Sequence, residues 1–208
     1  MSARGSPRWD GEGLRNVQPI LPGLRDPHAS MPSLSEFLLR TGVRRVPVRP
    51  LPAVSPLEVW RYKPGSGLRA AWLGHSTVLI EIDGVRVLTD PVWGLCASAL
   101  TLAGPKRLQS VPVALGAMPP VDLVVISHDR YDHLDDPTIR ALARSAVSIV
   151  TSPGGGAHLQ AWGAPPQRIA ELDGWPHHDL PGSGIPVSAA PAQHFCGRKP
   201  KTRNSTLW

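Results

Sequence analysis

One short polar loop of this 208-residue chain carries most of its potential for metal chemistry. Its residues are His128-Asp129-Arg130-Tyr131-Asp132-His133, and they directly follow an apolar run. Imidazole and carboxylate groups suit zinc, and α/β folds place ligands just beyond the carboxyl ends of buried strands. Alternate positions of an extended loop point the same way, so His128 and Asp132 could converge on one cavity. Taken singly, His128 could cap the strand, Asp132 could hold an Asx turn, and His133 could be a solvated loop residue.

Four other features have both a functional and a structural interpretation. His75, in a Gly-His-Ser turn, could lie near a pocket or serve local hydrogen bonding. Tyr131 could line a substrate cleft or anchor its loop. The adjacent side chains of His177 and His178 should diverge, which argues against a shared metal. The glycines at 154–156 lack the Lys and Ser/Thr of a phosphate-binding loop, and the start of a helix is sufficient reason for them.

The elements around the polar loop predict a βαβ unit. Residues 121–127 are nearly continuous in apolar content, as expected for a strand covered on both faces. After the loop at 128–135, a helix is predicted over 136–144, with Asp136 as its cap and Pro137 at its first position. A second strand is predicted over 146–151.

Shorter elements should follow this unit and lead to one more histidine. We expect a helix over 154–162, a strand over 167–172 and a strand over 186–190. The last strand opens onto Gln193-His194-Phe195. His194 therefore lies at the end of a predicted strand.

Three β-rich runs precede the loop. They cover residues 69–73, 77–82 and 85–89, and Asp83-Gly84 joins the last two in the manner of a type I′ hairpin turn. Residues 1–66 hold 10 of the 24 prolines and predict an extended arm with one short helix at 33–39. We therefore expect two parts: a Pro-rich N-terminal arm over 1–66 and an α/β domain over 67–208.

Composition and charge exclude several classes of protein. Hydrophobic residues make up 41% of the chain and charged residues 18%, which fits a globular protein and neither a coiled coil nor a wholly disordered one. The net charge of +6 sits mostly on residues 1–66, where 10 Lys and Arg face 5 Asp and Glu. Because a basic recognition helix and interleaved aromatic residues are missing, no nucleic-acid partner is expected. The basic residues Arg198, Lys199, Lys201 and Arg203 predict a solvated face.

The cellular setting is also predicted from composition. No apolar run approaches the roughly 20 residues that span a bilayer, and the first residues lack the apolar stretch of a signal peptide, so a cytoplasmic location is expected. Cys96 and Cys196 lie far apart, which favours buried free thiols over a disulfide.

The polar loop and five further strings resemble a known family. His128-x-Arg130-x-Asp132-His133 resembles the HxHxDH signature of the metallo-β-lactamase fold. The strings that resemble its N-acylphosphatidylethanolamine-hydrolysing phospholipase D branch are Trp72-Leu73-Gly74-His75-Ser76-Thr77-Val78-Leu79-Ile80, Leu88-Thr89-Asp90-Pro91-Val92-Trp93, Ala103-Gly104-Pro105-Lys106-Arg107, Glu171-Leu172-Asp173-Gly174-Trp175 and Pro191-Ala192-Gln193-His194-Phe195. The resemblance implies an αββα sandwich, with two β-sheets between helices.

The resemblance also implies roles for individual residues. His128 and His194 would bind a first metal, and Asp132 and His133 a second, with Asp132 in the catalytic centre. Asp90 matches a carboxylate that orients the ligands, and His75, Arg130 and Tyr131 would lie around the pocket. Neutral His ligands need such a carboxylate partner to fix their tautomer.

Two departures from the family pattern bear on activity. Arg130 stands where the signature has its second His, and a guanidinium has no lone pair to donate to a metal. The chain stops at Asn204-Ser205-Thr206-Leu207-Trp208, where the resemblance calls for further strands, a bridging Asp and a final His. We therefore expect only the N-terminal half to two-thirds of the sandwich, in a chain that appears truncated before the last metal ligands.

Two hypotheses of function follow. By resemblance the chain is a zinc-dependent hydrolase acting on a small-molecule or lipid phosphodiester by metal-assisted hydrolysis, with weak or incomplete zinc binding and impaired activity. Catalytic zinc typically has about three protein ligands, whereas each metal here has two. The alternative is a truncated, non-catalytic remnant or a binding protein, and the chain could also form an oligomer. If the site has decayed, Arg130 has replaced a former metal ligand. If the site is specialised, Arg130 holds an anionic substrate.

Overall fold

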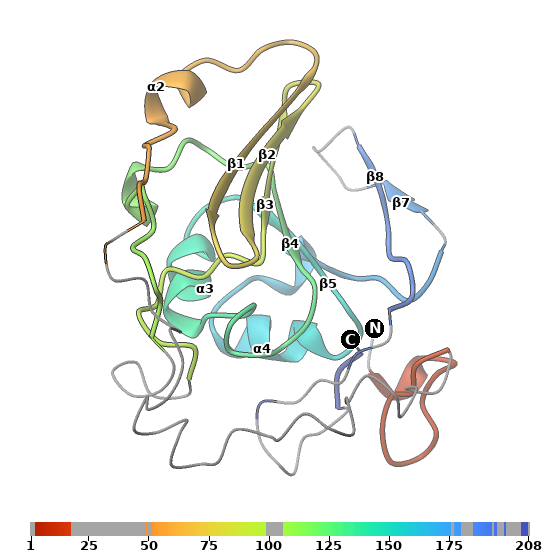
Figure 1. Cartoon of the computed structure of the whole chain (residues 1–208). Helices are drawn as coiled ribbons and strands as arrows, with labels where there is room; N and C mark the ends of the chain where they lie inside the picture. The colour runs from red at the N-terminus through yellow and green to blue at the C-terminus, as the bar shows by residue number, and fades with distance from the viewer. Residues whose placement is uncertain are drawn as a thin grey trace, which may run out of the picture.

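A six-stranded mixed sheet forms the centre of the computed structural model (Figure 1). The structure describes residues 3–17, 49, 51–98, 106–175, 177–179, 185–192, 194, 198 and 205–207. The strands lie in chain order and are β1 (Leu68–Gly74), β2 (Thr77–Ile82), β3 (Val85–Thr89), β4 (Leu123–Ile126), β5 (Ser148–Thr151) and β6 (Ile169–Glu171). The β1–β2 and β2–β3 pairs are antiparallel, and the pairs from β3 to β6 are parallel.

The predicted hairpin turn between β2 and β3 is confirmed. Asp83 and Gly84 both have positive φ, at 47° and 80°, as a type I′ turn requires. This turn sets a register in which Ile82 faces Val85 and Val78 faces Thr89. The carboxyl end of β3, with Asp90 just beyond it, is thereby placed beside β4.

The predicted βαβ unit is also confirmed, with one correction at its helix. β4 and β5 are parallel and joined through α3 (Asp136–Leu142). The cap is Asp135 rather than Asp136: its carboxylate accepts hydrogen bonds from the Thr138 backbone N–H and from the Gly94 N–H. Because the capping residue keeps extended backbone angles while Asp136 is already helical, the sequence-based prediction was one residue late. α3 ends at Leu142, two residues earlier than predicted, and the next strand starts at Ser148 rather than at 146.

The two faces of the sheet carry separate apolar clusters. Alternate residues of β4 divide between them, with Val124 and Ile126 in the larger cluster and Leu123 in the smaller. The larger cluster includes Ile139 of α3 and Leu159 of α4 (Gly155–Ala161), so helices cover that face (Figure 1). β4 is thus covered on both sides, as its apolar run predicts.

A small second sheet covers the other face. It pairs β7 (His177–Asp179) with β8 (Pro186–Ser188), and Val187 of β8 packs against the smaller cluster. The sequence predicted β8, although two residues longer, and missed β7. Helix α4 and β6 lie within the predicted ranges 154–162 and 167–172.

Tight backbone approaches explain the glycines at the start of α4. Gly154 has a φ of 88°, and a Cβ on Gly155 would clash with Thr151 Oγ1. A structural role accounts for both, as the sequence suggested. Three short 3-10 helices complete the described elements and span Ala3–Gly5, Leu115–Ala117 and Pro166–Arg168.

A buried ion-pair network attaches the segment before β1 to the sheet. Glu81 is fully buried, and its Oε2 accepts from Arg69 and from Arg86 at 2.9 Å each. The same two guanidiniums donate to backbone carbonyls of residues 59–62, in and beside α2 (Leu57–Trp60). Part of the predicted N-terminal arm therefore packs on the hairpin.

Residues 3–17 lie beside the end of the chain (Figure 1). Ser6 and Arg8 contact the Asp173 carboxylate, the latter at 3.0 Å, and Asn16 Nδ2 donates to the His194 carbonyl at 2.8 Å. The helix predicted at 33–39 lies outside the described residues, as does Cys196. Cys96 is buried with a free thiol, as predicted.

Candidate metal centre

Four segments bring their side chains together at one edge of the sheet. Asp90 follows β3, and the loop 128–133 follows β4. Because these strands are parallel neighbours, their carboxyl ends meet at the same edge. The β1–β2 turn adds His75, and the segment after β8 adds His194.

Asp90 holds the first of these side chains in place. Its Oδ1 accepts from the Ser127 N–H at 2.7 Å, and its Oδ2 lies 2.8 Å from both Ser127 Oγ and His133 Nδ1. The carboxylate thus engages Nδ1 of His133 and leaves Nε2 as the nitrogen that could bind a metal. Asp90 has a φ of 37°, an uncommon angle for a non-glycine residue and one that Asp tolerates better than most.

His128 presents a buried ring nitrogen without a hydrogen-bond partner. Its Nδ1 lies 2.9 Å from Ser127 Oγ, and in the part of the chain that the structure describes its Nε2 has no such partner. The ring lies 4.1 Å from that of His133 and 4.6 Å from that of His194, centroid to centroid. Burial, with the neighbouring charges of His133 and His194, lowers the pKa of His128 to about 4, so the imidazole is neutral at pH 7. A neutral imidazole with a free nitrogen is in the form that binds a metal.

Asp132 lies between two imidazoles. Its Oδ2 is 3.1 Å from His75 Nε2 and 3.7 Å from His133 Nε2. One ligand atom from each of these three residues lies within 4.8 Å of the others. Burial opposes ionisation of Asp132, but a hydrogen bond from its own backbone and the charges of His133, Arg130 and His75 outweigh it and hold its pKa below the usual value.

Arg130 reaches the other oxygen of the same carboxylate. Its Nε lies 3.6 Å from Asp132 Oδ1, whereas the imidazoles face Oδ2. The guanidinium therefore lies beside the site but supplies no ligand atom, because it has no lone pair to donate.

Tyr131 anchors the loop. Its hydroxyl donates to the Arg198 carbonyl at 2.8 Å, and the Arg198 guanidinium lies 4.1 Å from the centre of its ring. Of the two interpretations of Tyr131, the structure favours the anchor.

Arg198 is half-buried, which corrects the expectation of a solvated face for this residue; Lys199, Lys201 and Arg203 lie outside the described residues. The Arg198 Nη1 donates to the Asp129 and Leu134 carbonyls at 2.8 and 2.7 Å, so one cation joins both ends of the polar loop. A second aromatic ring, that of Trp162, lies 5.0 Å from the guanidinium. Burial lowers the pKa of this guanidinium below its usual value.

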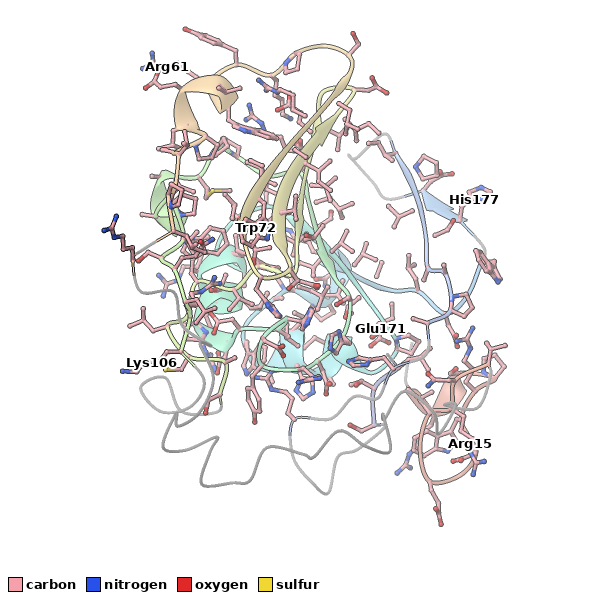
Figure 2. The ribbon with its side chains drawn as sticks, viewed as in Figure 1. Arg15, Arg61, Trp72, Lys106, Glu171 and His177 are labelled. Atoms are coloured by element: carbon pink, nitrogen blue, oxygen red, sulfur yellow. The ribbon has the colours of Figure 1, made fainter. Side chains whose placement is uncertain are left out.

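A pocket of about 390 Å³ opens beside the carboxylate and imidazole groups. His75 and Asp132 form part of its wall, with the apolar side chains of Leu51, Trp72 and Leu108. Trp72 is an exposed ring on β1 (Figure 2), and its Nε1 donates to the His75 carbonyl at 2.8 Å. His75 and Asp132 are therefore accessible from a mainly apolar cavity.

Comparison with known proteins identifies the family. A model of the beta-lactamase superfamily domain matches residues 85–208. The chain belongs to this superfamily. A Mycobacterium tuberculosis protein called "Uncharacterized protein Rv0906" is 47% identical over 174 residues, which are 83% of this chain and 45% of that protein. The "N-acyl-phosphatidylethanolamine-hydrolyzing phospholipase D 1" of Caenorhabditis elegans is 34% identical over an aligned length of 211 residues, which covers 96% of this chain and 55% of that protein.

Solved structures of metallo hydrolases also match this superfamily domain. Igni18 of Ignicoccus hospitalis is 22% identical, with a TM-score of 0.45 over 61% of this chain and 49% of its own. The family match by itself confirms the metallo-β-lactamase fold expected from the sequence. The chain spans about half the length of the curated relatives it matches.

The donor set of this superfamily domain fits a divalent metal. The structure brings together the predicted residues His128, Asp132, His133, His194 and Asp90, and adds His75 by direct contact with Asp132. The free Nε2 of buried His128 is the group that most needs such a partner. Sequence reasoning missed Ser127, Arg198 and Asn16, whose contacts with the site depend on the tertiary structure.

Two remaining observations concern the surroundings of the site. His177 lies on β7 of the small sheet, apart from Trp72 (Figure 2). Across the described residues, no helix is both long enough and apolar enough to cross a membrane.

Proposed function

We propose that this chain contributes the metal centre of a metal-dependent hydrolase acting on lipid phosphodiesters. The observation that carries the proposal is the buried His128 Nε2, which lacks a hydrogen-bond partner among the described residues. The His128 ring is tilted against that of His133 at 4.1 Å and lies edge-on to that of His194 at 4.6 Å. An orphaned ring nitrogen costs free energy unless it is satisfied, and a metal satisfies it.

In this proposal His128 and His194 hold one zinc ion, and Asp132 and His133 hold another. Zinc held there would supply Lewis-acid chemistry, by lowering the pKa of a water and polarising a phosphoryl oxygen. Asp90 orients His133 through its Nδ1, and Ser127 orients His128. Arg198 keeps the ends of the ligand loop at a constant separation.

The substrate class rests on two supports. The names of the Caenorhabditis elegans relative and of a yeast mitochondrial relative, 29% identical over 140 residues, specify N-acyl-phosphatidylethanolamine. The pocket next to Asp132 is lined by Leu51, Trp72 and Leu108, which suits an apolar substituent. Arg107 also lines it, and a cation suits the phosphate of such a substrate.

The test combines metal analysis with hydrolysis. The purified chain is dialysed against zinc, analysed for metal, and assayed with bis(p-nitrophenyl) phosphate and with vesicles of N-acyl-phosphatidylethanolamine. We expect zinc at fewer than two ions per chain, and slow hydrolysis that His128→Ala abolishes. A chain that binds no zinc under these conditions would overturn the proposal.

One observation favours a non-catalytic binding protein instead. Arg130 places a permanent positive charge 3.6 Å from Asp132, where the charge opposes a dication. Zinc binding without hydrolysis of either phosphodiester would decide for this alternative.

A further inference from the structure

We infer that His75 is a third protein ligand of the metal held by Asp132 and His133. The inference rests on the proposed function, since it needs a metal at that position. It changes the count from two protein ligands to three, the number that catalytic zinc sites commonly have.

The distances suit this assignment. Zinc lies about 2.0–2.2 Å from nitrogen and oxygen ligands, which in a tetrahedral site separates the ligand atoms by about 3.4 Å. His75 Nε2 and Asp132 Oδ2 are 3.1 Å apart, and His133 Nε2 and Asp132 Oδ2 are 3.7 Å apart. The three ligand atoms all lie within 4.8 Å of one another, so small side-chain movements suffice to enclose one ion.

The backbone of the β1–β2 turn directs His75 toward the loop. Gly74 and His75 both have positive φ, at 118° and 50°, and the strand register is irregular between Trp72 and Gly74. The Trp72 indole holds the His75 carbonyl. A left-handed histidine is uncommon, and here the turn projects its ring to within hydrogen-bond distance of Asp132.

Arg130 and the imidazoles approach different oxygens of Asp132. Arg130 faces Oδ1, while both imidazoles face Oδ2. A metal bound through Oδ2 therefore has two imidazoles beside it, and the carboxylate lies between the metal and the guanidinium.

The same arrangement gives substrate access to the metal. His75 and Asp132 both line the 390 Å³ pocket, so a site formed by them has its open side toward that pocket. The pocket is where a substrate or an activated water would enter.

The experiment measures metal binding by the full chain, independently of hydrolysis. Zinc is titrated into wild type, His75→Asn and His75→Gln. Asn tolerates the left-handed backbone, and Gln retains the reach needed for a hydrogen bond to Asp132. His177→Gln is the matched control, because it removes an exposed imidazole on β7. Thermal unfolding confirms that each variant is folded.

If His75 is a ligand, both variants weaken the tighter zinc affinity by about a hundredfold or more, and X-ray absorption shows one imidazole fewer around the metal. The control should match wild type. If His75 only hydrogen-bonds to Asp132, His75→Gln keeps wild-type affinity and imidazole count, which would overturn this inference while leaving the proposed metal centre intact. Wild type that binds no zinc at all would overturn the proposed function itself.

Discussion

At the scale of single residues, the two carboxylates of the centre, Asp90 and Asp132, have different roles. Asp90 uses both oxygens to hold Ser127 and His133, whereas Asp132 turns one oxygen to the imidazoles and the other to Arg130. The Asp90 carboxylate therefore orients the candidate ligand His133, whereas the Asp132 carboxylate is itself a candidate metal ligand.

Asp90→Asn should weaken zinc binding by about 10- to 100-fold, because an amide cannot stabilise the His133 tautomer as a carboxylate does. Asn tolerates the positive φ of this position, so the fold should be kept. Isothermal titration with zinc checks the prediction. Asp136→Asn is the control, because it alters an exposed carboxylate that pairs with Arg140. Equal affinities in Asp90→Asn and wild type would contradict the supporting role.

Arg130→His should raise zinc affinity by about tenfold, because a neutral imidazole replaces a fixed positive charge close to Asp132. Metal content after dialysis measures this directly. If Arg130 has replaced a former metal ligand, phosphodiesterase activity should rise together with the zinc affinity. More metal with less activity would instead identify Arg130 as a residue that holds the substrate anion.

At the scale of elements, the ligand loop is held by a segment far along the chain. Arg198 donates to the carbonyls of Asp129 and Leu134 and contacts the rings of Tyr131 and Trp162. It therefore joins the loop after β4, the residue that follows α4 and the segment after β8. The loop depends on these contacts because its own backbone is neither helix nor strand.

Arg198→Lys should lower the free energy of unfolding by about 2 kcal/mol, because an ammonium cannot span both carbonyls and stack on both rings. Zinc affinity should fall as well, since the loop ends are released. Urea unfolding and zinc titration measure the two effects. Arg168→Lys is the control: this arginine also donates to a carbonyl, that of Ser145, but away from the centre. If Arg198→Lys loses stability and keeps wild-type zinc affinity, the Arg198 contacts stabilise the fold but do not position the metal ligands.

At the scale of the whole molecule, the two ends of the described chain lie together. Residues 3–17 contact Asp173 and His194, while Ser152 Oγ and the Pro153 carbonyl bond the backbone of Leu207. Contacts of such large sequence separation tie the N-terminal segment to the body that carries the centre.

Asp173→Asn should speed trypsin cleavage after Arg15 several-fold, because Arg8 loses its counter-charge and the N-terminal segment opens more often. Limited proteolysis followed by mass spectrometry checks this. Asp179→Asn, an exposed change on β7, should leave the rate unchanged. Identical cleavage of Asp173→Asn and wild type would show that this ion pair does not hold the segment.

Local patterns in the sequence determined most of the sheet. Asp83-Gly84 specified a turn through positive φ at two adjacent residues, and the unbroken apolar run at 121–127 specified a strand covered on both faces, because such features act over a few residues. The short strand β7 was missed since its residues, His177–Asp179, carry no β-rich pattern and pair only because β8 lies alongside. The predicted helix cap was one residue too late, because Asp135 and Asp136 are both aspartates that could cap the helix and Asp135 does so.

In the candidate centre too, the sequence predicted some residues, while only the tertiary structure brought others into contact. His128, Asp132 and His133 were predicted because one loop holds them, and His194, Asp90 and the pocket residue His75 because they match family strings. His75 stands 57 residues before Asp132, and Arg198 stands 69 residues after Asp129, so no local spacing relates them to the loop. Only the pairing of β1 with β2 and the return of the chain after β8 bring an imidazole to Asp132 and a guanidinium beneath the loop, because packing of the sheet decides which distant side chains meet.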